Sequence, residues 1–579
     1  MQRSWAVTVV ACVVHVGGCD FGAGSEPEIR AEVLPVQAPP PVTAPSHPRL
    51  AFAPLELDSA ALEPRTTSMA WVGGQPVRIG FSRLMKVGQV IGGARFGQLL
   101  DVTGEPLPGP AGLCAAPDFN GVLPRAGGAW WLSQFECQPG GIALTRVEHA
   151  PDGGLTAVRT APVSFASVNG TWVNCAGAVT PWGTHLATEE YEPDARGFEP
   201  GAHIDKYWGR IHQYYKGDPT KARPYHYGWM PELTVADDGS VAVAKHYAMG
   251  RFSHEIGVVM PDRRTVYLSD DAPTHGGLFM FVADESDDLS AGHLYAARWH
   301  QTSIELGGKA TLAWIDLGHS TDQAIAAMLG EDPRFNQLFD VLPTDGDTCT
   351  AGSTRVVTAS HSEAECLVLR DGKSEAASRL ETRRYAATLG ATTEFVKAEG
   401  MALDVDAGRV YLALSAIVAS ATGAGEPTQT DHIILPENRC GGVYALDLSP
   451  GAQDAAGQVI DSAFVATGVE AVVVGRLAGK MCSPDGIANP DNLAYLPGHR
   501  ALMIAEDTRG HDRALLWHFD TLAKTLTPVH AAPPKAEVTG IAWVPDLGGH
   551  GYLTITHQTD GDRPSEVGTL GPFPSLAQE

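Results

Sequence analysis

Basic residues are scarce in this sequence, and they form no cluster. The 579 residues contain 41 lysines and arginines against 67 aspartates and glutamates, which gives a formal net charge of −26. Proteins that bind nucleic acid carry basic patches or stripes, so we expect no nucleic-acid partner. Beyond residue 19, no stretch reaches the roughly 18 consecutive apolar residues that a membrane-spanning helix needs. Neither a phosphate-binding P-loop nor a G-x-S-x-G nucleophile turn is present, which excludes two common kinds of catalytic site.

The first nineteen residues have the pattern of a lipoprotein signal peptide. Arg3 provides a short basic region, and Trp5 to Val14 is largely apolar. Val16-Gly17-Gly18-Cys19 has the form of a lipobox, in which small residues precede the cysteine that is lipidated after cleavage. An ordinary secretory signal is the alternative. We therefore expect an exported protein, anchored by a lipid at Cys19 to the bacterial cell envelope, in the periplasm or at the cell surface.

Residues 20–50 differ in composition from the rest of the chain. They are rich in Pro, Ala, Gly and Glu and lack hydrophobic periodicity, which is typical of a flexible tether. Residues 51–579 are numerous enough for one large repetitive fold. We expect this part to be monomeric and to contact a membrane only through the lipid anchor.

Seven cysteines remain once Cys12 has left with the signal and Cys19 has been lipidated. Disulfides persist outside the cytosol, and an odd number of cysteines leaves at least one thiol without a partner. Joining nearest neighbours is one of several possible connectivities, and the choice of Cys175 as the free thiol rests on the motif around it. The predicted pairs are Cys114–Cys137, Cys349–Cys366 and Cys440–Cys482.

Several segments share one shape, in which two alternating apolar runs flank a turn with Asp or Gly. Such turns favour hairpins, and loosely repeated hairpins are typical of propeller blades. We predict an all-β fold, a β-propeller with six blades. The segments are Leu233–His246, Met401–Ser415, Asn492–Asp507 and Ile541–His557.

Helical patterns occur between Trp314 and Phe395. Ser320–Leu329 opens with capping residues and is predicted to form one helix, and Lys373–Leu389 is a stronger helix candidate. We interpret residues 315–395 or so as a small, partly helical insertion between blades. In a propeller, the ends of the inner strands and their loops face one mouth of the central channel, so distant residues can converge there.

The segment from Asn174 to Glu190 carries the first candidate ligands. The thiolate of Cys175 is a soft ligand that suits iron or another transition metal, although a buried or disulfide-bonded cysteine is the alternative. Glu189 and Glu190 follow a short apolar step. Adjacent strand residues point to opposite faces, so one of this pair is expected to face the channel. A solvated acidic loop is the alternative.

Two downstream blocks add carboxylates and cations. G-R-F-S-H-E contains Arg251 and ends in Glu255, and the pair Asp270-Asp271 follows. The second histidine of a zinc-protease H-E-x-x-H motif is missing after Glu255. Hard carboxylates suit calcium, whereas surface charge is the alternative for an Asp-Asp pair. Lys397-Ala398-Glu399-Gly400 supplies a lysine and a further carboxylate.

The late part of the chain holds another group of oxygen ligands. Asp491 and Asn492 open one hairpin, Glu506 and Asp507 close it, and Glu537 follows. Carboxylate and amide oxygens are natural calcium ligands, although Asp-Asn is also ordinary turn chemistry. Glu136 and Glu232 are lesser candidates on the same argument.

These blocks, in this order, resemble the PhoX-type alkaline phosphatases, a family of secreted calcium- and iron-dependent phosphatases on a β-propeller. The likeness extends over roughly residues 60–570 and is most specific at N-C-A-G-A-V-T-P-W-G-T and at G-R-F-S-H-E. The resemblance implies that Lys397 and Arg251 contact phosphate. It implies that iron is held by Cys175, Glu255 and Glu399. It implies that calcium is held by Glu189, Glu190, Asp270, Asp271, Asp491, Asn492, Glu506, Asp507 and Glu537.

Two positions depart from the family pattern. Ala187 stands where the family commonly has a second cysteine, and Lys397 stands where it has arginine. Lysine binds phosphate as a point charge and not as a bidentate fork, so the second change bears on substrate binding.

The function implied is hydrolysis of phosphate monoesters of small molecules, with bound cations offsetting the acidic charge. One alternative is a calcium-binding propeller with weak or no activity that acts as an anchored binding module. The other is a calcium-dependent propeller lactonase or esterase.

Overall fold

The computed structural model describes residues 50–56, 61–198, 210–345, 348–361, 363–423, 431–559 and 563–575. The predicted signal peptide, the predicted lipidation site Cys19 and the predicted tether before Leu50 lie outside the described residues. Within the described part of the chain, no helix is both long and apolar enough to cross a membrane.

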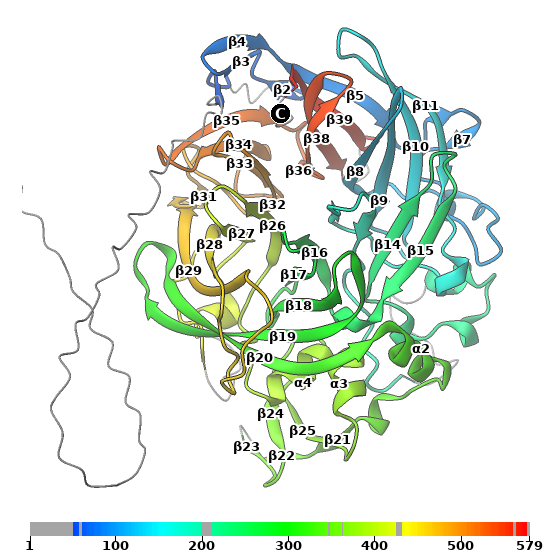
Figure 1. The fold of residues 1–579 in the computed structure, drawn as a ribbon, viewed down its shortest axis with the longest axis vertical. Helices are drawn as coiled ribbons and strands as arrows, with labels where there is room; N and C mark the ends of the chain where they lie inside the picture. Colours follow the sequence, from blue (N-terminus) through cyan, green and yellow to red (C-terminus); the bar gives the residue numbers. More distant parts are fainter. Residues whose placement is uncertain are drawn as a thin grey trace, which may run out of the picture. The chain divides into compact units, whose positions relative to one another are not determined.

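Antiparallel sheets of four or more strands dominate the described residues and surround a common centre (Figure 1). The predicted all-β propeller fold is confirmed. One continuous nine-stranded sheet runs from β16 to β20 and then through β29, β28 and β27 to β26. Because this sheet spans two hairpin repeats, the sheets do not divide cleanly into six blades, and the blade count stays a prediction.

The strand bounds follow the chain around the centre. The first two four-stranded sheets are β8 Pro117–Arg125, β9 Gly128–Phe135, β10 Gly141–His149 and β11 Leu155–Pro162, then β12 Gly177–Val179, β13 His185–Ala187, β14 Met230–Val235 and β15 Val241–His246. The nine-stranded sheet is β16 His254–Val259, β17 Thr265–Asp270, β18 Leu278–Glu285, β19 Asp288–Ser303, β20 Lys309–Thr321, β26 Ala398–Asp404, β27 Arg409–Leu414, β28 Gly442–Ser449 and β29 Val465–Val474.

Two five-stranded sheets complete the circuit, and each contains a strand from the N-terminal part of the chain. One is β32 Pro490–Leu496, β33 Ala501–Glu506, β34 Leu515–Asp520, β35 Thr525–Ala531 and β2 Arg65–Thr66. The other is β36 Ala536–Thr539, β38 His550–Thr559, β39 Glu566–Pro574 and β5 Gly80–Lys86, with β37 Trp543–Leu547 paired to β38. Pairing of β2 with β35 and of β5 with β39 joins the two ends of the described chain and protects sheet edges.

Four hairpins lie where the turn patterns predicted them. They are β14–β15, β26–β27, β32–β33 and β37–β38, each antiparallel. The local alternation of apolar residues and the Asp/Gly turns were sufficient to locate them, because both signals act within one hairpin.

Among its described residues, the segment between β20 and β26 contains three α-helices and a small three-stranded sheet. The first helix, α2 (Asp322–Gly330), is capped by Thr321, whose hydroxyl accepts the Ala324 N–H at 3.0 Å. The predicted helix over Lys373–Leu389 is wrong as a single helix, because it breaks at Glu381 into α3 (Ser374–Leu380) and α4 (Thr382–Thr388). The small sheet has the order β21 Phe339–Leu342, β25 Glu365–Leu369, β24 Thr354–Val356.

The break at Glu381 has a tertiary cause. Its backbone leaves the helical region with φ −130° and ψ 50°, and its carboxylate accepts from the Tyr225 hydroxyl at 2.7 Å and from Arg384 at 2.6 Å. These buried contacts outweigh the local helix propensity that the sequence pattern reports.

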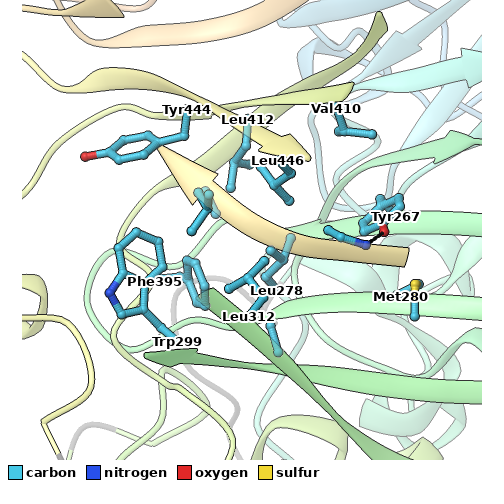
Figure 2. Close-up of a cluster of buried hydrophobic side chains, with 14 of the residues drawn as sticks. Tyr267, Leu278, Met280, Trp299, Leu312, Phe395, Val410, Leu412, Tyr444 and Leu446 are labelled. Atoms are coloured by element: carbon cyan, nitrogen blue, oxygen red, sulfur yellow. Dashed lines mark hydrogen bonds between the residues drawn. The ribbon is translucent and has the colours of Figure 1, made fainter. Parts of the chain in front are cut away.

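A large part of the core lies between the two halves of the nine-stranded sheet. Figure 2 shows buried side chains of β17, β18, β19 and β20 packed against those of β27 and β28. Trp299 and Tyr444 are among them, and the Tyr267 hydroxyl donates to the Phe464 carbonyl at 2.7 Å. Burial of these aromatic side chains, each worth roughly 3–5 kcal/mol against alanine, holds the two halves together.

Three disulfides join the predicted partners. Cys114–Cys137, Cys349–Cys366 and Cys440–Cys482 are bonded, and Cys175 is a free, buried thiol. The predicted connectivity is confirmed.

Candidate metal centre

An acidic residue recurs at the same position in the strands that lie nearest the centre (Figure 1). It is the second residue of each of these strands. These residues are Asp118 in β8, Glu255 in β16, Glu399 in β26, Asp491 in β32 and Glu537 in β36. In the first four of these strands the pairing register shifts at this residue. Such a bulge re-aims a side chain, and here it releases the carboxylate from the regular alternation of the sheet.

In three of these hairpins, the residue that follows the neighbouring strand is a second carboxylate. Glu136 follows β9, Asp271 follows β17 and Asp507 follows β33, each directly after the residue that pairs with the start of the inner strand. Ser415 occupies the same place after β27. Acidic residues from distant parts of the sequence therefore meet because the hairpins repeat.

The sheet that contains β12 and β13 supplies the thiol. Cys175 precedes β12 and donates its S–H to Glu136 Oε1 at 2.9 Å, and Glu190 follows β13. Together with the acidic residues of the preceding paragraphs they form what we call the carboxylate ring. Its members are Asp118, Glu136, Cys175, Glu190, Glu255, Asp271, Glu399, Asp491, Asp507 and Glu537.

Within the ring, three groups have ligand atoms within 4.8 Å of one another. They are Asp118, Glu136 and Cys175; Cys175, Glu190 and Glu255; and Glu255, Asp271 and Glu399. Cys175 and Glu255 are each shared by two groups, so the three groups adjoin. Spacings of this order suit ligands around adjacent metal ions.

A tight bend precedes several ring residues. Two positions before Cys175, Glu399, Asp491 and Glu537, the backbone enters the left-handed region. The residues there are Val173 (φ 31°), Lys397 (φ 49°), Asn489 (φ 48°) and Lys535 (φ 61°). This conformation is uncommon for residues other than glycine and costs on the order of 1–3 kcal/mol each, and such outliers gather at functional sites.

The ring is largely buried, and much of its oxygen surface has no protein partner. Both carboxylate oxygens of Glu255 lack a hydrogen-bond partner among the described residues, as do Asp118 Oδ1 and Asp271 Oδ1. Burial raises the pKa of Glu255, and the charges of Glu399 and Asp491 raise it further. Burial and Asp271 raise the pKa of Glu399 to about 8.

Buried carboxylates without partners are costly, and nearby cations are what makes their charge tolerable. The donor set of carboxylates and one thiol therefore fits multivalent cations. Lys397 is a positive group of the protein in contact with the ring, and its Nζ lies 2.6 Å from Asp271 Oδ2 and 2.8 Å from Glu399 Oε1.

Residues 144–558 match the family described as alkaline phosphatase PhoX. The chain belongs to this family. The prediction of the family from the sequence motifs is confirmed, and with it the prediction of a phosphoric ester hydrolase.

Solved structures add a comparison at the level of the fold. Pseudomonas fluorescens PhoX, in complex with the transition-state analogue vanadate, is 17% identical with a TM-score of 0.59, and the match covers 92% of this chain and all of that one. Two other structures are far less similar. Kuenenia stuttgartiensis hydrazine synthase is 11% identical with a TM-score of 0.30, and the match covers 76% of this chain and 92% of that one. The β-propeller domain of the Pyrococcus furiosus trilobed protease is 8% identical with a TM-score of 0.27, and the match covers 80% of this chain and 99% of that one. The comparison with curated proteins found no significant match.

In this PhoX-family chain, three pairs of adjacent acidic residues each place only their second residue in the ring. Glu190, Asp271 and Asp507 belong to the ring, whereas the residue before each of them has partners elsewhere. Glu189 pairs with Lys245 at 2.7 Å, Asp270 accepts from Arg383 at 2.8 Å, and Glu506 accepts from Trp517 at 2.6 Å and from His511. Adjacent residues at a strand end point to opposite sides, so only one of each pair reaches the centre.

Other candidates from the sequence lie beside the ring or away from it. Asn492 Oδ1 accepts from Thr539 and Gly540, and its amide donates to Asp491 at 3.1 Å, so Asn492 orients a ring carboxylate. Glu232 accepts from Trp182 and His246, each at 2.7 Å, and is absent from the ring.

Arg251 also points away from the ring. Its buried guanidinium donates to the backbone carbonyls of Tyr227 at 2.7 Å and Pro224 at 3.2 Å and lies over the Tyr225 ring.

Two residues of the site were missed in the sequence. Asp118 belongs to the ring, and the repeat of Pro117-Asp118 at the start of β8 and Pro490-Asp491 at the start of β32 is the signal that could have identified it. Tyr191 donates its hydroxyl to Asp271 Oδ2 at 2.7 Å. No sequence pattern marks this contact, because it joins residues that follow strands of two different sheets.

Proposed function

We propose that the carboxylate ring binds calcium and iron ions and that the protein uses them to hydrolyse phosphate monoesters of small molecules. One observation carries the proposal: the two oxygens of Glu255 are buried at the junction of the ligand groups, and no partner among the described residues meets them. Membership of the PhoX family supports the same chemistry. Vanadate in Pseudomonas fluorescens PhoX supports a phosphoryl-transfer site in the related fold.

The ligands divide by chemical softness. Cys175 with Glu190 and Glu255 suits iron, because thiolates favour transition metals over calcium. The all-oxygen group of Glu255, Asp271 and Glu399 suits a hard cation. When bound, such cations act as Lewis acids on the ester oxygens and lower the pKa of a bound water.

Lys397 is the residue that we assign to the phosphate. Its ammonium is anchored on Asp271 and Glu399, yet its side chain remains 29% exposed, so it faces both the ring and solvent. An anchored cation beside the ring attracts the anionic ester and stabilises negative charge on the phosphoryl oxygens. Arg251 does not contact the phosphate in this proposal, because its guanidinium donates to backbone carbonyls.

We also propose that the protein acts outside the cytosol, anchored through Cys19. The three disulfides support export, because such bonds persist in oxidising compartments. Metabolic labelling of the full chain with a fatty acid tests the anchor: Cys19→Ser is expected to abolish labelling, and undiminished labelling would contradict it.

The site itself is tested by Glu255→Gln. This substitution removes a charge at the junction of the ligand groups, so we expect loss of bound metal and a fall of about 100-fold or more in kcat with p-nitrophenyl phosphate. Glu148→Gln, an exposed glutamate of β10, is the matched control. Full activity and metal content in Glu255→Gln would refute the proposed site.

A further inference from the structure

Tyr191 stands at the rim of the carboxylate ring, with its hydroxyl directed inward. The hydroxyl donates to Asp271 Oδ2 at 2.7 Å, and the same oxygen lies 2.6 Å from Lys397 Nζ. The residue is nevertheless 45% exposed. Tyr191 thus bonds the carboxylate that anchors Lys397 and is also open to the solvent from which a substrate arrives.

The backbone of Tyr191 is fixed on both sides. Its N–H donates to Ser253 Oγ at 2.7 Å, and its carbonyl accepts from Trp172 Nε1 at 3.0 Å. Its φ of 48° lies in the left-handed region, where tyrosine is rarely found. With the backbone held in this conformation and the hydroxyl bonded to Asp271, the aromatic ring presents one fixed face at the rim.

We propose that Tyr191 determines substrate specificity by contacting the alcohol part of the phosphate ester, and that it favours esters whose alcohol carries an aromatic group. This inference rests on the proposed function. A phosphoryl group held at Lys397 and the ring directs its alcohol toward the exposed side. The Tyr191 ring supplies a flat apolar surface there, whereas Asp507, the exposed member of the carboxylate ring, supplies only charge. Stacked or edge-on aromatic pairs favour such a ligand.

The test compares 2-phenylethyl phosphate with ethyl phosphate, because both are esters of primary alcohols and differ by one remote aromatic ring. We expect the metal-loaded wild type to prefer the phenylethyl ester by about 2- to 10-fold in kcat/KM, mainly through KM. Tyr191→Leu should bring the ratio close to one. Tyr191→Phe keeps the aromatic face and should keep the preference, even where loss of the hydroxyl changes turnover of both esters.

The inference would be overturned if Tyr191→Leu kept the wild-type ratio of kcat/KM for the two esters. It would also be overturned if the wild type had the same kcat/KM for both esters. If neither ester is hydrolysed by the metal-loaded wild type, the proposed function fails instead. A second measurement needs no variant: phenylphosphonate should inhibit the wild type more strongly than methylphosphonate, and equal inhibition would overturn the role of Tyr191.

Discussion

Lys397 forms an ion pair with Asp271, in which its Nζ lies 2.6 Å from Oδ2. The same Nζ lies 2.8 Å from Oε1 of Glu399. Burial alone would lower the pKa of Lys397, but the charges of Glu399 and Asp271 outweigh burial and raise it well above its ordinary value. The lysine therefore keeps its positive charge under the alkaline conditions at which the family works. This explains how lysine can stand where the family pattern has arginine.

Replacing Lys397 tests its role in binding phosphate. Lys397→Met removes the charge while keeping much of the chain length, so we expect kcat/KM for p-nitrophenyl phosphate to fall by about 100- to 1,000-fold. Lys397→Arg keeps the charge and restores the family residue, so most activity should remain. Steady-state kinetics of the three proteins check this, and an unchanged kcat/KM in Lys397→Met would contradict the assignment.

Replacing Cys175 tests whether its thiol binds iron. Cys175→Ser replaces the soft thiol by a hard oxygen of similar size, so we expect the iron content per chain to drop while calcium binding persists. Elemental analysis of the full chain, purified without chelator, measures both. Iron retained at the wild-type level would show that the thiol is not its ligand.

Arg383 of α4 connects the segment between β20 and β26 to the two loops that carry Asp271 and Glu190. It bonds Asp270 at 2.8 Å and also pairs with Glu192, and all three side chains are buried. Arg383→Met leaves two buried carboxylates without their partner, so we expect a loss of about 3–5 kcal/mol in the free energy of unfolding.

Urea unfolding checks the Arg383 prediction. The control is Arg83→Met, which breaks the more exposed pair with Glu566 and should cost less than about 1 kcal/mol. Equal effects of the two substitutions would show that Arg383 has no special structural role.

The raised pKa of His246 predicts how the stability of the fold depends on pH. Burial would lower the pKa of His246, but hydrogen bonds to Asp322 and Glu232 outweigh burial and raise it to about 9. A folded-state pKa above the unfolded value of about 6.5 means that the folded state holds the proton more tightly. The stabilisation is complete below pH 6.5 and is lost as pH rises through 9.

Thermal unfolding between pH 6 and pH 10 measures this loss. We expect the melting temperature of the wild type to fall over the upper part of this range. His246→Gln should start lower and show a weaker decline, because it has no proton to lose. If the melting temperatures of the two proteins changed in parallel with pH, His246 would not be the source of the pH dependence.

The sequence predicts the hairpins, the disulfides and the family because each signal is local or a matter of motif order. The hairpin Asn492–Asp507, for example, is encoded by its own alternation and its own turn. Cys175, Glu255 and Glu399 can be selected from the sequence alone, because each lies in a specific motif.

The parts that the sequence could not supply depend on direction and on distant contacts. Choosing Asp271 and not Asp270 requires the position of Arg383, which is 113 residues away from Asp270 in the sequence. The break of the predicted helix at Glu381 likewise depends on the distant Tyr225 hydroxyl. A pattern within one segment contains no information about either partner.

The most direct test of the whole account is hydrolysis of p-nitrophenyl phosphate by the full chain at alkaline pH, first with calcium and iron, then with excess chelator, then after the metals are restored. The account predicts turnover that the chelator abolishes and the restored metals recover. Turnover that is unaffected by complete removal of metal, or no turnover from folded and metal-loaded protein, would contradict a metal-dependent phosphatase built on the carboxylate ring.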